Sequence, residues 1–116
     1  MNVAIVGSRE FDNYDSLREV MYTLYPSPDM ITSIVSGGAR GADTLAERFA
    51  TEHDLPMRVF KADWETWGVR AGYMRNKLIV DSATEVVAFW NGKSNGTRHT
   101  IELAEKNHKL RKLVIF

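Results

Sequence analysis

Residues 31–50 read ITSIVSGGARGADTLAERFA, and this stretch decides the fold. The apolar run from Ile31 to Val35 predicts a buried strand. A glycine-rich loop, SGGARGAD, follows the strand, and the apolar residues after Ala42 recur with the period of a helix. A strand, a glycine loop and a helix in direct succession indicate one unit of a parallel α/β sheet.

The same order of strand and helix recurs along the chain. Further strands are expected at residues 2–6, 57–60, 85–90 and 113–116, and further helices at about 13–25, 70–82 and 97–107. The segment KADWETWG, residues 61–68, is expected to be a loop. Right-handed crossovers then predict an α/β, Rossmann-like three-layer sandwich, formed by residues 1–116 as one domain. Its five-stranded parallel sheet has the order 3-2-1-4-5, with helices on both faces.

Composition narrows the class of protein. Fifteen Lys and Arg balance fifteen Asp and Glu, so the net charge supplies no general attraction to a nucleic acid or an anionic membrane. The chain has no cysteine, and His53, His99 and His108 are too scattered for a metal site. Because the first apolar run is too short for a signal peptide or a membrane span, we expect a cytoplasmic protein with no membrane partner and no metal.

The predicted strand order places a ligand crevice at one edge of the sheet. The winding direction changes between the first and fourth strands, where the glycine-bearing loops should converge. Glycine loops that open helices allow a ligand phosphate to approach free backbone N–H groups. Neither the Walker A pattern nor the dinucleotide fingerprint is present. The candidate ligand-binding residues are Gly7, Ser8, Arg9, Ser36, Gly37, Gly38, Arg40, Gly41, Asp43, Asp63, Arg75, Asn76, Asn91, Gly92, Ser94, Gly96 and Thr97.

Charged and aromatic side chains near this crevice have several readings. Arg75 falls at the centre of an apolar helical stripe that includes Met74 and Leu78, where a cation needs an internal carboxylate or a ligand phosphate as its partner. Arg75, Asp43 and Asp63 are the candidate catalytic residues, although each acid can instead cap a helix or a loop. Trp64 and Trp67 can pack, stack on a base or seal a homo-oligomer interface, and packing is favoured.

Four segments carry a family resemblance: GSREF (7–11), VSGGARGADTLAERFA (35–50), ADWETWGVRAGYMRN (62–76) and VVAFWNGKSNGTRHTI (86–101). Together they resemble the YspA-like branch of the SLOG superfamily, which includes Smf-type DNA-processing proteins, Lonely-guy phosphoribohydrolases and nucleotide-sensing domains. The resemblance spans nearly the whole chain. It implies a Rossmann-like fold and a nucleotide-derived ligand.

The chain is similar more distantly to the Lonely-guy enzymes, which carry an arginine in an R-K motif and a glutamate in P-G-G-x-G-T-x-x-E. This resemblance implies the same pair of residues here. Arg75-Asn76 resembles the first motif, and Asn95-Gly96-Thr97 resembles part of the second. The position of the catalytic glutamate is Thr100 here, and Glu102 is turned about 160° away on a helix. The expected catalytic carboxylate is therefore missing.

Three functions follow, in order of preference. The first is binding or sensing of a phosphorylated nucleoside or ADP-ribose-like ligand, with Gly37, Gly38 and Arg40 around the phosphate and Arg75 supporting it. The second is hydrolysis of nucleoside monophosphates at the N-glycosidic bond, and the third is binding of single-stranded DNA. No cofactor is required, the enzyme question stays open, and the zero net charge makes a nucleic acid the less favoured partner.

Overall fold

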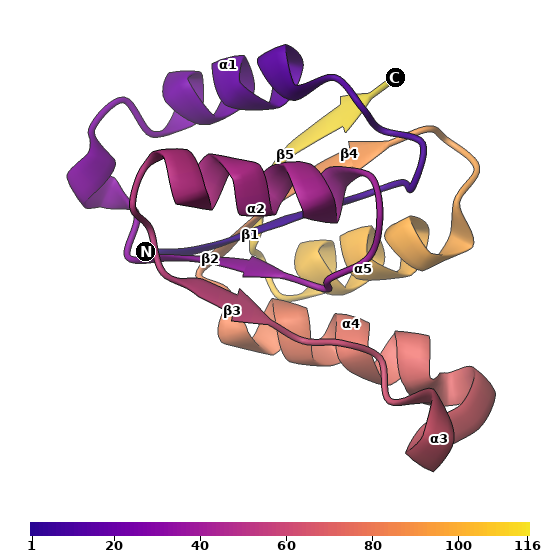
Figure 1. Cartoon of the computed structure of the whole chain (residues 1–116). Coiled ribbons are helices and arrows are strands. Elements are labelled where there is room, and N and C mark those ends of the chain that lie inside the picture. Colours follow the sequence, from indigo (N-terminus) through magenta and orange to yellow (C-terminus); the bar gives the residue numbers. More distant parts are fainter.

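Five parallel strands form the centre of the molecule (Figure 1). The computed structural model describes residues 1–116, the side chain of Pro28 excepted. The strands are β1 (Asn2–Gly7), β2 (Ser33–Ser36), β3 (Met57–Val59), β4 (Glu85–Trp90) and β5 (Leu110–Ile115). They pair in the order β3-β2-β1-β4-β5, so the predicted Rossmann-like sheet and its order are confirmed.

Helices cover both faces of this sheet (Figure 1). Helices α1 (Tyr14–Leu24) and α2 (Ala42–Glu52) pack on the face that carries Val3 and Ile5. Helices α4 (Ala71–Ser82) and α5 (Asn95–Lys106) pack on the face that carries Ala4 and Val6. Because alternate residues of a strand point to opposite faces, both sides of β1 are buried, which explains its unbroken apolar sequence.

The region between β3 and α4 differs from the predicted loop. It contains a short helix, α3 (Trp64–Trp67), followed by the 3₁₀ turn η2 (Gly68–Arg70); a second 3₁₀ turn, η1 (Pro28–Met30), precedes β2. The Asp63 carboxylate accepts a hydrogen bond from the Thr66 N–H at 3.1 Å and so caps α3. Strand β5 also begins three residues earlier than expected, and its register shifts opposite Val86 and Val87.

The apolar stripe predicted around Arg75 is wrong in part. Ala71 and Ile79 are buried, but Met74 and Leu78 are 37% and 51% exposed. Each residue advances by about 100° around a helix, so the side of α4 that meets the sheet is centred near Ile79, and Arg75 lies at its border. Helix α4 therefore has an apolar surface on the side turned away from the sheet as well.

Candidate functional site

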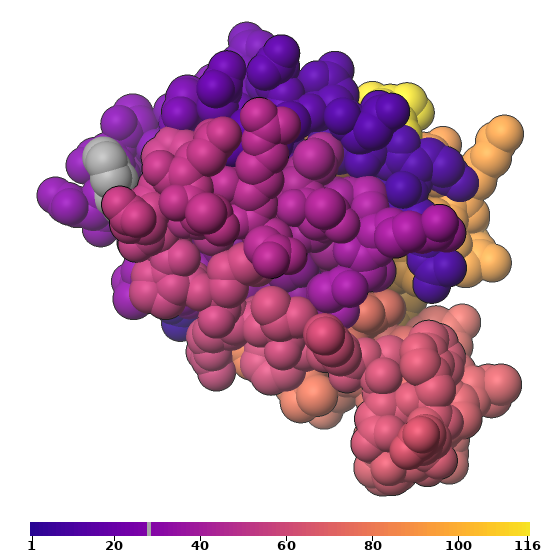
Figure 2. Space-filling model, viewed as in Figure 1, coloured from indigo at the N-terminus to yellow at the C-terminus, as the bar shows by residue number. Residues whose placement is uncertain are grey.

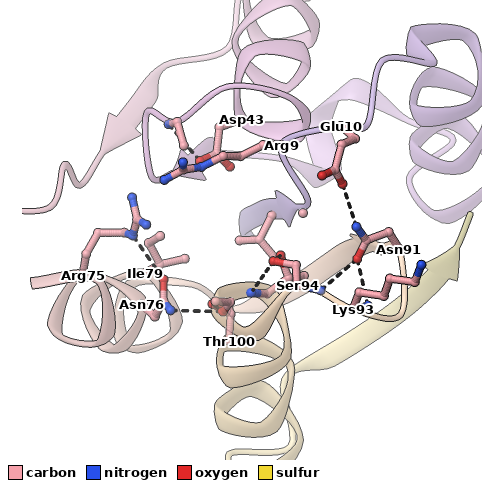
Figure 3. A pocket seen from close by; sticks show the side chains of 15 residues that line it. Arg9, Glu10, Asp43, Arg75, Asn76, Ile79, Asn91, Lys93, Ser94 and Thr100 are labelled. Carbon is pink, nitrogen blue, oxygen red and sulfur yellow. Dashed lines mark hydrogen bonds between the residues drawn. The ribbon is translucent and has the colours of Figure 1, made fainter. Parts of the chain in front are cut away.

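A pocket of about 520 Å³ opens beyond the carboxyl ends of the strands, which is a normal size for a small-molecule site (Figure 3). It lies where the loops after β1, β2 and β4 meet helix α4, as the winding change predicted. Its lining residues are Val6, Gly7, Arg9, Glu10, Ala39, Asp43, Arg75, Asn76, Ile79, Asn91, Lys93, Ser94, Gly96, Thr97 and Thr100.

Helix α2 begins at the pocket because its first turn lies directly on the loop after β1. Gly41 has φ +76°, and a Cβ there would run into the backbone of Ser8 and Arg9. The Ala42 N–H donates to the Ser8 carbonyl oxygen at 3.4 Å, and no side chain caps this helix end among the residues described. The positive end of the α2 dipole is thereby directed at the pocket.

Gly37 and Gly38 do not line the pocket, although they were expected around the phosphate. A Cβ on Gly37 would lie 2.8 Å from Arg75 Nη1, and a Cβ on Gly38 would lie 2.9 Å from Val59 Cγ1. Gly37 therefore leaves room for the arginine, while Gly38, at φ +72°, faces the end of β3. These two glycines therefore affect the conformation of the loop without lining the pocket.

Arg75 is held in the pocket wall by two hydrogen bonds. Its Nη1 donates to the Gly37 carbonyl oxygen at 3.0 Å, and its Nε donates to Asn76 Oδ1 at 3.1 Å. Burial lowers the pKa of Arg75, and the nearby Asp43 charge opposes that effect. A guanidinium has five N–H donors, so several remain for a ligand oxygen.

Asp43 is a buried carboxyl that lines the same pocket and is only 8% exposed. Its Oδ2 accepts a hydrogen bond from the Ala39 N–H at 3.0 Å. Burial raises the pKa of Asp43 from 3.8 to about 6, while the Ala39 hydrogen bond and the Arg75 charge oppose the increase. A carboxyl that titrates near neutrality can accept or donate a proton.

The start of helix α5 forms the opposite wall. Asn91 Oδ1 accepts hydrogen bonds from the N–H groups of Lys93 and Ser94, both at 2.9 Å, and Ser94 caps the helix. Gly96 lines the pocket in the first turn, where a Cβ would meet nothing within 4 Å. A ligand can therefore approach the first N–H groups of α5 without hindrance.

Asn76 joins the two helices at the bottom of the pocket (Figure 3). It is 6% exposed, and its Nδ2 donates to the Gly96 carbonyl oxygen at 3.2 Å and lies 3.2 Å from His99 Nδ1. Burial lowers the pKa of His99, so its neutral imidazole can accept that bond. The positions of Arg75 and Gly96 are thus coupled through one side chain.

The structure brings together about half of the sequence candidates. Those that line the pocket are Gly7, Arg9, Asp43, Arg75, Asn76, Asn91, Ser94, Gly96 and Thr97. Those outside its lining are Ser8, Ser36, Gly37, Gly38, Arg40, Gly41, Asp63 and Gly92. Sequence reasoning missed Val6, Glu10, Ala39, Ile79, Lys93 and Thr100. Glu10 and Lys93 could have been found, because they lie within the predicted loops.

The pocket carboxylates are Asp43 and Glu10, and the Glu10 Oε2 accepts a hydrogen bond from Asn91 Nδ2 at 2.6 Å. Thr100 lines the wall and its Oγ1 donates to the Gly96 carbonyl oxygen, whereas Glu102 is exposed outside the pocket. Within the described part of the chain, no cluster of three or more His, Cys, Asp or Glu could hold a metal ion. None of the described helices is long and apolar enough to cross a membrane.

The raised pKa of Asp43 predicts a pH-dependent stability. Between pH 3.8 and about 6 the folded state keeps a proton that the unfolded state releases, so this stabilisation is full below 3.8 and is lost as the pH rises through about 6. Relative to Asp43→Asn, the parent should lose up to about 3 kcal/mol of unfolding free energy between about pH 4 and pH 7. Urea denaturation measures this difference.

Asp63 provides the control, because hydrogen bonds from Thr66 lower the pKa of its exposed carboxyl. Between about pH 4 and pH 7 the parent and Asp63→Asn should therefore show the same slope, because the stabilisation that Asp63 contributes is lost only below pH 3.8, as the pH falls through its lowered pKa. Identical pH slopes for the parent and Asp43→Asn would mean that Asp43 stays charged throughout.

Comparison with solved structures supports the description of the fold. A structure of DNA processing protein A from Helicobacter pylori, described for its single-stranded DNA binding mode, superimposes with a TM-score of 0.63. The match covers 95% of this chain but only 63% of the Helicobacter chain, at 21% identity, so it shows a shared fold.

This neighbour corrects one expectation. The neutral net charge made a nucleic acid the less favoured partner, and that reasoning was wrong, because a protein with this fold binds single-stranded DNA. Net charge does not describe a local site: Arg9, Arg75 and Lys93 gather at one pocket of a neutral chain.

Sequence relatives define the family. Gene 61 protein of Mycobacterium phage D29 is 36% identical over 111 residues, which cover 90% of this chain and 88% of the phage protein. Residues 1–67, more than half of the chain, match the model of the YAcAr family, described as the YspA, cpYpsA-related SLOG family. The chain belongs to this SLOG family.

Proposed function

We propose that the chain binds a phosphorylated nucleoside or another nucleotide-derived ligand in the pocket beyond the sheet. The observation that carries the proposal is the convergence of the α2 and α5 N-termini on one pocket lined by Arg9, Arg75 and Lys93. Helix N-termini and cations each favour an anion, and here both act on one pocket. The pocket volume accommodates a nucleotide.

The phosphate fits best at the start of α5. Lys93 and Ser94 lie at this end of the pocket, and Gly96 leaves the backbone open to a close contact. Asp43 lies on the other side of the pocket and would repel a dianion when ionised (Figure 3). Asp43 is better suited to accept ribose hydroxyl groups, and Val6 and Ile79 offer apolar surface for a base.

Hydrolysis of the N-glycosidic bond is the alternative that Asp43 favours, since its pKa of about 6 suits a general base. Against it, Thr100 occupies the position where the Lonely-guy resemblance requires a carboxylate. We therefore expect binding without multiple-turnover release of base. Single-stranded DNA is a further candidate, because it presents the same phosphate and base chemistry in a longer ligand.

Gly96→Ala separates binding from folding. Alanine is the better helix former, so the variant should gain up to about 1 kcal/mol of stability. Its methyl group would enter the ligand space, and nucleotide affinity should fall at least about tenfold, with Gly96→Val worse. Calorimetric titration with nucleoside monophosphates and ADP-ribose, together with thermal melts, measures both effects.

The control is Gly72→Ala, which replaces another helical glycine. Gly72 lies outside the pocket, so this variant should retain nucleotide affinity. Unchanged affinity in Gly96→Ala would remove the phosphate site from α5.

Arg75 tests the chemistry of the same pocket. Arg75→Ala should weaken nucleotide binding more than Arg75→Lys, which keeps the charge but loses the two-pronged donor geometry.

Chromatography of nucleoside monophosphates incubated with the parent protein should show little free base. Robust release of base that Asp43→Asn abolishes, with affinity retained, would establish the hydrolase instead.

For single-stranded DNA, the logarithm of the binding constant should fall with the logarithm of the salt concentration with a slope of about −2 if Arg9, Arg75 and Lys93 all contact phosphates.

A further inference from the structure

The first half of α4, which carries Arg75, packs against the body of the molecule on one side only. Helix α3 and the turn after it, which precede α4, project from that body (Figures 1 and 2). On this half of α4, Ala71 and Asn76 are buried, whereas Tyr73 and Met74 are 51% and 37% exposed. The place of Arg75 in the pocket wall therefore depends on the polar contacts that Asn76 makes with α5.

The orientation of the Asn76 amide follows from its partners. Arg75 Nε is a donor with no acceptor capacity, so the Asn76 atom 3.1 Å from it is the oxygen. The Asn76 Nδ2 then reaches the Gly96 carbonyl oxygen at 3.2 Å, and a carbonyl oxygen only accepts. Both contacts require the same orientation of the amide. This orientation leaves the second Nδ2 hydrogen for His99 Nδ1, which is 3.2 Å away.

His99 must therefore present a lone pair at Nδ1, which requires the neutral ring with its proton on Nε2. A second proton on the ring would place two donors opposite one another at this contact. The Asn76 amide cannot turn over to avoid them, because its oxygen would then leave Arg75 and its Nδ2 would leave Gly96. Since Asn76 is only 6% exposed, water is a poor substitute for a lost partner.

The groups around His99 favour the neutral ring. Tyr73 of α4 packs edge-on against it with ring centroids 4.6 Å apart, and Lys77 of α4 pairs with Asp81 instead. Strands β1, β4 and β5 present apolar side chains to the helices on this face of the sheet. Glu102, on the same helix, is the carboxylate whose charge favours the protonated ring. Burial outweighs that charge and lowers the pKa of His99 below its ordinary value of 6.5.

We propose that His99 is a positioning residue for the ligand pocket. Its neutral ring fixes the Asn76 amide, and through it Arg75 and the first turn of α5, whereas its protonated ring releases them. His99 lies outside the lining of the pocket, so it acts on a ligand through Asn76. The consequence for nucleotide affinity rests on the proposed function: binding weakens as the pH falls and His99 takes up a proton.

Nuclear magnetic resonance of the free protein tests the positioning role without a ligand. At about pH 7.5 the His99 nitrogen signals should show the tautomer protonated on Nε2, and the Arg75 Nε–H should be protected from exchange with solvent. At about pH 5 that protection should be at least about fivefold lower than in His99→Asn at the same pH. His99→Leu offers no acceptor and should lack the protection at both pH values.

His99→Asn is the rescue variant, because its Oδ1 stands at the same place along the side chain as His99 Nδ1 and accepts a hydrogen bond at every pH. At about pH 7.5 it should bind adenosine monophosphate within about twofold of the parent, whereas His99→Leu should bind at least about fivefold more weakly. At about pH 5 the parent should bind at least about fivefold more weakly than His99→Asn. Asp43 and the ligand phosphate also titrate in this range, but they are common to both proteins.

His108→Asn is the matched control, because His108 is exposed beyond the end of α5 and has a φ of 57°, which asparagine tolerates. It should follow the parent at both pH values, and circular dichroism verifies that each variant is folded.

A His99 ring that is charged, or protonated on Nδ1, at about pH 7.5 would overturn the proposal. So would equal Arg75 protection, or equal pH dependence of the affinity, in the parent and His99→Asn. If the parent binds no adenosine monophosphate while the resonance results are as expected, the proposed function fails and the free protein still supports the positioning role.

Discussion

The pocket depends on Ser8, a buried residue that ties together three loops from distant parts of the sequence. Its N–H donates to the Phe89 carbonyl oxygen at 2.9 Å, and its own carbonyl oxygen accepts from Ala42 at 3.4 Å. Its Oγ accepts from the Asn91 N–H at 3.2 Å. Because Ser8 is 1% exposed, water cannot replace these bonds, and each one would be costly to leave unmade. The three loops therefore hold one relative position.

Close packing around that residue explains two of the glycines. A side chain at Gly7 would meet Phe89 and the Ala42 Cβ, and one at Gly41 would meet the Ser8 backbone. Their absence lets the α2 N-terminus approach the end of β1, so the helix dipole reaches the pocket. Gly96 is different, because a Cβ there would meet nothing within 4 Å. Gly7 and Gly41 thus permit close packing of the backbone, whereas Gly96 borders open space.

Helix α4 has two surfaces with different chemistry. Its inner side presents Arg75 and Asn76 to the pocket, where burial lowers the pKa of Arg75 and raises the pKa of its neighbour Asp43. Its outer side exposes Tyr73, Met74 and Leu78 together with Lys77, which pairs with Asp81 at 3.9 Å.

The sequence alone was sufficient to predict the architecture, because the spacing of apolar residues and the glycine-bearing turns between elements are local properties of the chain. Apolar runs such as Val3–Val6 and Val86–Phe89 identified the central strands, and the winding rule indicated the edge of the sheet at which the pocket opens. Tertiary structure alone decided which loop residues face that crevice. Gly38 faces Val59, Asp63 caps α3, and Glu10 and Lys93 reach the pocket, as long-range packing dictates. The raised pKa of Asp43 and the exposure of Met74 and Leu78 were equally beyond a linear reading, because burial depends on neighbours brought together only by folding.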